Sequence, residues 1–120
     1  ELPLLKDKKI LVKGSLKRVR DFIFIDDVNY VLNKSIKFRK FNNQIFNLGT
    51  GKSTTVKNLI SNLIKFEKNI SLKVTKSTPN DQNSIIADTR KIKKIIKLKP
   101  TMLKYGLYKF YKWSKHNKVC

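Results

Sequence analysis

Two short apolar runs, each followed directly by a helix-starting signal, constrain the fold of this chain most strongly. Residues 22–25 read Phe-Ile-Phe-Ile, an apolar and β-favouring run that predicts a buried strand over 21–25. Asp26 and Asp27 end the run, and either carboxylate can cap a following helix. That helix is predicted over 27–37, because apolar residues then recur at helical spacing.

The second junction begins at residues 44–48, which predict a short strand that runs into Gly49 and Gly51. Glycines at such a point allow positive φ or a close approach of two backbones. An apolar stripe then predicts a helix over 54–67. Its candidate N-caps are Ser53, Thr54 and Thr55.

The remaining pattern is mixed α/β, without internal repeats or low-complexity linkers. Further strands are predicted over 10–13, 70–75 and 85–87, and further helices over 88–97 and 101–116, with a short helical lead-in over 1–5. Asp88 is expected to cap the helix over 88–97, and Thr101 to start the last one. A length of 120 residues permits one domain with a modest core.

The charge of the chain is a weak guide to its function. A net charge of +20 would ordinarily indicate binding to nucleic acid or to an anionic surface. Nearly all the cations are lysines, however, with arginine only at 18, 20, 39 and 90, and Lys, Asn and Ile together are what an AT-rich genome encodes. The lysines are also spread along the chain. A small basic nucleic-acid-binding module therefore stays as the alternative function.

Two short segments suggest a phosphate-binding loop and a carboxylate pair, but neither has the residue pattern that such a site requires. Residues 49–54 read Gly-Thr-Gly-Lys-Ser-Thr, but the first glycine of a Walker A loop would fall on Phe46. Asp26 and Asp27 are adjacent, so their carboxylates point in different directions and are better read as caps than as a metal or acid–base pair. One His and one Cys, His116 and Cys120, are too few for a metal or nucleophile site.

Seven short motifs occur in an order and at a spacing that resemble one family. They are Ile10-Leu11-Val12-Lys13-Gly14, Arg20-Asp21-Phe22-Ile23-Phe24-Ile25-Asp26-Asp27-Val28, Phe46-Asn47-Leu48-Gly49-Thr50-Gly51, Asp81, Ala87-Asp88-Thr89-Arg90-Lys91, Leu98-Lys99-Pro100, and Gly106-Leu107 with Trp113. In this order they resemble the C-terminal part of the extended short-chain dehydrogenases/reductases, the NAD-dependent epimerases and dehydratases that act on nucleotide sugars.

The resemblance implies an α/β fold, with residues 1–120 as a single partial domain that binds the nucleotide sugar and lacks the N-terminal Rossmann half. No glycine-rich dinucleotide fingerprint opens the chain, and the catalytic Tyr-x-x-x-Lys pair of the family is expected to be missing too. NAD is thus implied for the intact family, whereas this chain is expected to bind no cofactor and no metal and to carry no catalytic residue. Whether it is an enzyme by itself stays open.

The expected partners are a nucleotide-diphosphate sugar and the missing N-terminal half. A homodimer of the intact enzyme is compatible with the resemblance, whereas no specific nucleic acid and no membrane are expected. The start at Glu1 suggests a longer reading frame, of which this chain would be a fragment or the remnant of a split or decaying gene. No apolar stretch is long enough to span a membrane and no signal peptide leads the chain, so a cytoplasmic location is expected.

Arg20 and Asp81 are the candidate substrate-binding residues. Arg20 occupies the Arg-Asp position of the family, where a guanidinium fork can take two phosphate oxygens. Asp81 occupies the aspartate of the family's Arg-Pro-Gly-Asp motif, which suits hydrogen bonds from a ribose hydroxyl. The alternative is structural: Arg20 would pair with Asp21 or another local carboxylate, and Asp81 would cap a turn beside Pro79.

Three positions depart from the family pattern. Thr78 stands where the family has the arginine that grips the nucleotide, and Lys13 stands where relatives often have an aromatic residue. Arg18 replaces a glutamine two residues before the Arg-Asp pair. Arg18 is expected to contribute much less to nucleotide binding than Arg20.

Overall fold

The structure is a computed structural model that describes residues 8–77, 79 and 81–117. Its elements, in chain order, are β1 (Lys9–Lys13), β2 (Val19–Arg20), α1 (Ile25–Lys37), the 3-10 turn η2 (Arg39–Phe41), β3 (Thr54–Thr55), α2 (Val56–Leu63), β4 (Ser71–Thr75), β5 (Ser84–Ile85), α3 (Arg90–Lys93) and α4 (Leu103–His116). The predicted lead-in helix over 1–5, Thr78 and Cys120 lie outside the described residues.

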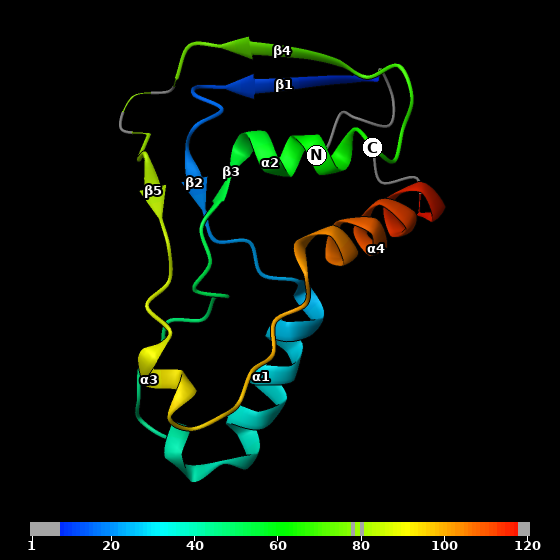
Figure 1. The fold of residues 1–120 in the computed structure, drawn as a ribbon. Helices are drawn as coiled ribbons and strands as arrows, with labels where there is room; N and C mark the ends of the chain where they lie inside the picture. The colour runs from blue at the N-terminus through cyan, green and yellow to red at the C-terminus, as the bar shows by residue number, and fades with distance from the viewer. Residues whose placement is uncertain (1–7, 78, 80, 118–120) are drawn as a thin grey trace.

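The upper part of the molecule is a parallel pair of strands packed on a helix (Figure 1). β1 and β4 pair in parallel, with Ile10 opposite Leu72 and Val12 opposite Val74. Because side chains alternate along a strand, Ile10 and Val12 both point to the face that packs on Ile60 of α2. These three buried residues form the first of two small hydrophobic cores.

The lower part is built from α1, η2 and α3 around a second core. Val31 of α1 packs there against Ile92 of α3 and against Ile96, which follows that helix. Phe41 and Phe46 close this core from the side, with their ring centroids 5.0 Å apart. The two parts are joined by extended segments that include β2, β3 and β5, in the order β3-β2-β5 (Figure 1).

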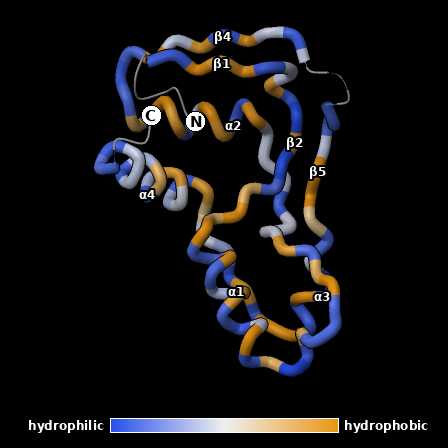
Figure 2. The backbone as a smooth tube through the Cα atoms, turned by 180° about the vertical axis from the view of Figure 1, so that it is seen from behind, coloured by the Kyte–Doolittle hydropathy of each residue, from blue (hydrophilic) through white to orange (hydrophobic). Residues whose placement is uncertain are grey.

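This arrangement leaves the molecule open rather than compact. The radius of gyration is 16.5 Å, whereas a compact domain of this length has about 13–14 Å. Hydrophobic stretches recur along most of the tube in Figure 2, and no large side chain in the described residues is fully buried. The largest exposures of apolar side chains are those of Ile36, Ile45 and Met102. None of the described helices has the length and hydropathy that a bilayer crossing requires.

The structure confirms the predicted strands over 10–13 and 70–75 and the predicted helices over 27–37 and 101–116, with shifts of one or two residues at their ends. The strand over 85–87 is present in shortened form as β5, and the helices over 54–67 and 88–97 shrink to α2 and α3. In the latter, β-branched isoleucines lower the helix propensity and like charges four residues apart, as at Arg90/Lys94 and Lys93/Lys97, repel each other.

Two predicted strands, over 21–25 and 44–48, are wrong. Residues 21–24 are irregular and α1 starts at Ile25, while residues 44–48 are irregular throughout. A β-favouring run becomes a strand only where a neighbouring strand takes up its backbone hydrogen bonds. In the described part of the chain no strand pairs with either run.

The expected caps turn out differently at each helix. Thr55 caps α2, because its Oγ1 accepts the N–H of Asn58 at 3.1 Å. Asp88 stands just outside α3, where Oδ1 accepts the N–H of Arg90 at 3.0 Å. At α1 the predicted cap is wrong, since its N-cap is Phe24, which makes no side-chain cap.

Asp26 and Asp27 lie in the first turn of α1 and have separate partners. Buried Asp27 accepts hydrogen bonds from the N–H and the Oγ1 of Thr101, at 2.8 and 2.9 Å, and so ties α1 to the segment before α4. Exposed Asp26 lies 3.4 Å from Nζ of Lys109 on α4. The two carboxylates therefore diverge, as predicted, but they join α1 to the C-terminal helix instead of capping.

Candidate functional site

The two candidate substrate-binding residues, Arg20 and Asp81, lie side by side although 61 positions separate them. β2 pairs in parallel with β5, and the N–H of Val19 donates to the carbonyl of Asn83 at 2.8 Å. Because of this pairing, the segment just before β5, which contains Asp81, runs beside Arg20. Arg20 Nη2 then donates to Asp81 Oδ1 at 3.0 Å, and the two side chains are 23% and 11% exposed. The carboxylate partner of Arg20 is thus distant in sequence.

Arg18 joins the same cluster, which its position in the sequence did not indicate. Its Nη1 donates to the second carboxylate oxygen of Asp81, and its Nη2 donates to the carbonyl of Lys13. Its Nε donates to the carbonyl of Ser15 at 3.0 Å. Asp81 is therefore held by two guanidinium groups, one on each oxygen. The spacing of two residues between Arg18 and Arg20, which would place both side chains on one side of an extended segment, is the signal that could have found this.

Gly14 makes room for the cluster at the end of β1. Its φ is +90°, a conformation that side chains other than glycine rarely adopt. A Cβ at this position would lie 3.0 Å from Asp81 Oδ2 and 3.1 Å from Arg18 Cζ. The motif residue Gly14 thus lets the backbone turn beside Arg18 and Asp81, which explains its place in the pattern.

Asp21, next to Arg20, holds the glycine loop in place. Its Oδ1 accepts the N–H of Thr50 at 2.9 Å and the hydroxyl of the same residue, and its Oδ2 accepts the N–H of Gly51 at 2.8 Å and of Ala87 at 3.3 Å. Burial acts to raise the pKa of the Asp21 carboxyl, but these hydrogen bonds outweigh it and hold that pKa below its ordinary value. Asp21 therefore joins three of the sequence motifs into one structure.

Gly49 is needed in this loop for space. A Cβ there would lie 2.5 Å from the Cβ of Ala87 and 2.6 Å from Asp21 Oδ2, closer than such atoms approach. Gly51 has a φ of +70°, a left-handed conformation that favours glycine. The two glycines of the motif thus have different physical roles.

A groove of about 580 Å³ runs beside this cluster. Its polar wall includes Arg20 and Asp21, and its apolar wall includes Phe46, Ile85 and Ile86. The remaining lining comes from Asn47, Leu48, Gly49, Ala87 and Asp88. An arginine at the edge of a partly apolar groove is a suitable place for an anionic group attached to a larger ligand.

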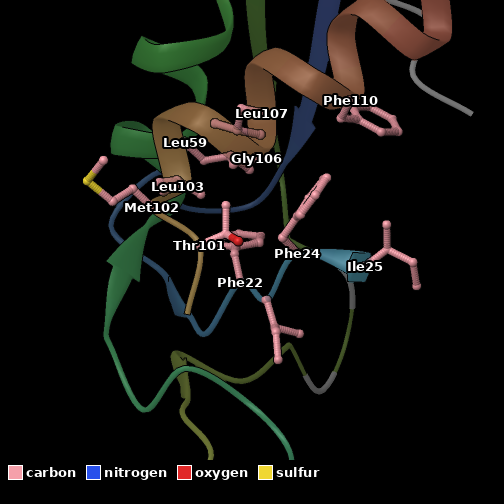
Figure 3. Close-up of a pocket in the computed structure, with 11 residues that line it drawn as sticks. Phe22, Phe24, Ile25, Leu59, Thr101, Met102, Leu103, Gly106, Leu107 and Phe110 are labelled. Carbon is pink, nitrogen blue, oxygen red and sulfur yellow. The ribbon is translucent and has the colours of Figure 1, made fainter. Parts of the chain in front are cut away.

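A second, apolar pocket of about 250 Å³ lies between the start of α4, the segment before α1 and α2 (Figure 3). Its lining includes Phe24 and Phe110, together with Leu59 of α2 and Leu107 of α4 (Figure 3). Gly106 faces Phe24, whose ring would lie 3.1 Å from a Cβ at that position. Among the residues that the structure describes, no charged one lines this pocket, so it suits a hydrophobic side chain rather than a charged ligand.

The amide groups that could bind a dinucleotide pyrophosphate are already engaged. The N–H groups of Thr50 and Gly51 donate to Asp21. At the start of α2, the N–H of Val56 donates to the carbonyl of Arg18, and the N–H of Lys57 donates to the carbonyl of Leu16. The N–H of Asn58 donates to its cap. The glycine loop and helix of this chain therefore do not fit NAD in the manner of a Rossmann motif. Among the described residues no cluster of His, Cys, Asp or Glu is suited to a metal.

The expectation that the Tyr-x-x-x-Lys spacing is missing is wrong. It occurs in Tyr30–Lys34 on α1 and in three overlapping copies within α4. In the first pair, Lys34 Nζ lies 5.5 Å from the centre of the Tyr30 ring. On α4, Lys109 and Lys115 lie similarly over Tyr105 and Tyr111. Four residues apart on a helix, such pairs make cation–π contacts on the helix surface, away from the arginine cluster.

Comparison with solved structures identifies the fold. An NAD-dependent NDP-hexosamine 5,6-dehydratase of tunicamycin biosynthesis matches 96% of the chain with a TM-score of 0.85 at 22% identity. The UDP-glucuronic acid 4-epimerase from Bacillus cereus, in complex with UDP-glucuronic acid and NAD, matches 95% with a TM-score of 0.84 at 26% identity. The UDP-Glc/GlcNAc 4-epimerase from Campylobacter jejuni matches 97% with a TM-score of 0.75 at 22% identity.

The chain therefore has the fold of the C-terminal portion of the NAD-dependent nucleotide-sugar epimerases and dehydratases, which confirms the resemblance found in the sequence. It spans only 37–38% of the length of these three structures. No family model and no curated protein sequence matches it.

Proposed function

We propose that this chain is the nucleotide-sugar-binding region of an NAD-dependent epimerase or dehydratase, and that an N-terminal Rossmann half supplies NAD and the catalytic residues. The observation that carries this proposal is the arginine–aspartate cluster beside the groove, in a chain with the fold of such enzymes. The coverage of about two fifths of those structures supports a division into two halves. Reading the DNA upstream tests this division, since the frame should encode the glycine fingerprint.

In this proposal Arg20 and Asp81 bind the nucleotide portion of the ligand. The guanidinium group of Arg20 offers N–H donors in a fork that matches two phosphate oxygens of a diphosphate. Asp81 offers carboxylate oxygens that can accept hydrogen bonds from ribose hydroxyls. The apolar wall of the groove, with Phe46, Ile85 and Ile86, can then cover the less polar parts of the ligand.

Replacing Arg20 by alanine should weaken nucleotide-sugar binding by roughly 1.5–3 kcal/mol, the scale of a hydrogen bond to a charged group. The measurement is calorimetric titration of UDP-glucose into the protein joined to its N-terminal half. Arg90→Ala is the matched control, because Arg90 also pairs with an aspartate but its side chain is 88% exposed and outside the groove. Equal losses for both variants would show that only general positive charge attracts the ligand.

The chain alone should not bind NAD. The motivation is the engaged set of amides around the glycine loop and at the start of α2, so that these described segments offer no Rossmann-type site for the pyrophosphate of a dinucleotide. Calorimetric titration of NAD into the 120-residue chain measures this directly. A micromolar dissociation constant would contradict the assignment of NAD to the other half.

A further inference from the structure

We propose that Asp81 is a built-in counter-ion that occupies the guanidinium groups of Arg18 and Arg20, and that the diphosphate of the ligand displaces it. Arg18 then becomes a second phosphate-binding residue beside Arg20. This inference rests on the proposed function for the identity of the ligand as a nucleoside diphosphate. It revises the expectation that Arg18 contributes much less than Arg20.

The first argument is the charge of the cluster. Two guanidinium groups share one carboxylate, and all three side chains are largely buried: that of Arg18 is 15% exposed, less than that of Arg20. Among the described residues no other carboxylate lies within ion-pair distance of either arginine. One positive charge is therefore left without a partner where water screens it poorly. An anion with more charge than a carboxylate would balance both arginines.

The second argument is that the arginines are held without Asp81. Arg18 donates from Nε to the carbonyl of Ser15 and from Nη2 to the carbonyl of Lys13. Arg20 donates from Nη1 to the carbonyl of Val19 at 2.8 Å. The two backbone acceptors orient the guanidinium group of Arg18 when the carboxylate leaves, and the single one holds Nη1 of Arg20. The result is a partly preorganised pair of guanidinium groups, which lowers the entropic cost of binding.

The third argument is the position of Asp81 itself. It lies in the connection between β4 and β5, outside both strands, whereas Arg20 belongs to β2 and lines the groove. The two carboxylates that line the groove are engaged elsewhere, Asp21 by backbone amides and Asp88 by Arg90, whereas Asp81 lies behind Arg20 as its ion-pair partner. Asp81 is thus the carboxylate that a phosphate arriving through the groove would replace.

The test is titration of inorganic pyrophosphate into the full chain at constant ionic strength, with circular dichroism recorded for each variant. Asp81→Asn removes the competing carboxylate and should raise the affinity for pyrophosphate about tenfold, the effect of one charged hydrogen bond. Asp88→Asn is the matched control, since it removes one negative charge from an exposed residue that lines the groove and does not contact Arg18 or Arg20 by any ion pair among the described residues. It should change the affinity less than twofold.

A rise of equal size for both variants, or a fall for Asp81→Asn, would overturn the inference. Arg18→Lys provides an independent test should Asp81→Asn not fold, because it keeps the charge and loses the fork. It should lower the affinity for pyrophosphate about tenfold, and unchanged affinity would equally overturn the inference. Pyrophosphate contains neither sugar nor base, so its titration tests the arginine pair alone. The titration of UDP-glucose tests the proposed function, so the two claims can fail separately.

Discussion

Asp21→Ala should destabilise this protein by about 2–4 kcal/mol, because it leaves backbone amides without an acceptor at a half-buried position. The N–H groups of Thr50, Gly51 and Ala87 all point at the lost carboxylate. The free energy of unfolding, measured by urea titration with circular dichroism, gives the effect. Asp21→Asn keeps one oxygen and the same shape, so we expect it to lose about half as much.

Asp88→Ala is the control for this result. Its carboxylate pairs with Arg90 in solvent, and exposed ion pairs contribute little to stability. We expect a change below about 0.5 kcal/mol for this variant. If Asp21→Ala and Asp88→Ala cost the same, the loop would not depend on the Asp21 carboxylate.

The same carboxylate makes the stability depend on pH. Its folded-state pKa lies below the ordinary value of 3.8, so the charged form is favoured by folding. The stabilisation is complete above that ordinary value and is lost as the pH falls through the lower, folded-state pKa. Urea titrations at decreasing pH should therefore show an acid-induced loss of stability that is smaller in Asp21→Asn. A parallel loss in both proteins would assign the effect to other carboxylates.

Gly49→Ala should destabilise the protein by about 1–3 kcal/mol, the usual range for overpacking. The new methyl group would lie 2.5 Å from the Cβ of Ala87, which belongs to the facing segment and cannot rotate away. The free energy of unfolding is again the measurement. Such a loss would show that the glycine is required for close approach, since its φ is not in the left-handed region.

A second substitution, at Ala87, should partly restore the stability of Gly49→Ala. Ala87→Gly removes the methyl group that Gly49→Ala would meet, so the double variant should be less destabilised than the sum of the two single variants. A coupling of about 0.5 kcal/mol or more is expected for residues in direct contact. Strict additivity would mean that the loop moves away from Ala87 and that the tight packing is not needed.

Arg18 shows how a substitution at one position can be read differently in sequence and in structure. In the sequence Arg18 replaces a glutamine of the family, and Thr78 stands where the family has the arginine that binds the nucleotide, so the sequence alone indicates a site that has lost a cation. In the structure Arg18 reaches Asp81 from the opposite side to Arg20. Within the described residues the cluster thus still contains two arginines. In the proposed phosphate site, Arg18 therefore compensates for the arginine that position 78 lacks.

The sequence by itself determined the elements whose pattern is local. The helices α1 and α4 follow from apolar residues at helical spacing, and Thr55 caps α2 through a contact three residues away. The order of the motifs also determined the fold class, because it reflects a whole arrangement and not one segment. Arg20 and Asp81 were found as a pair of candidates from these motifs.

Only the tertiary structure decided what depends on partners distant in the chain. Residues 22–25 and 44–48 favour strands, yet they remain irregular because strand formation needs a neighbouring strand to take up backbone hydrogen bonds. Asp21 and Asp27 find their partners across 29 and 74 positions, so neither contact could be read from spacing. The cluster of Arg18, Arg20 and Asp81 exists for the same reason: the parallel pairing of β2 with β5 sets its geometry, and pairing is a property of the folded chain.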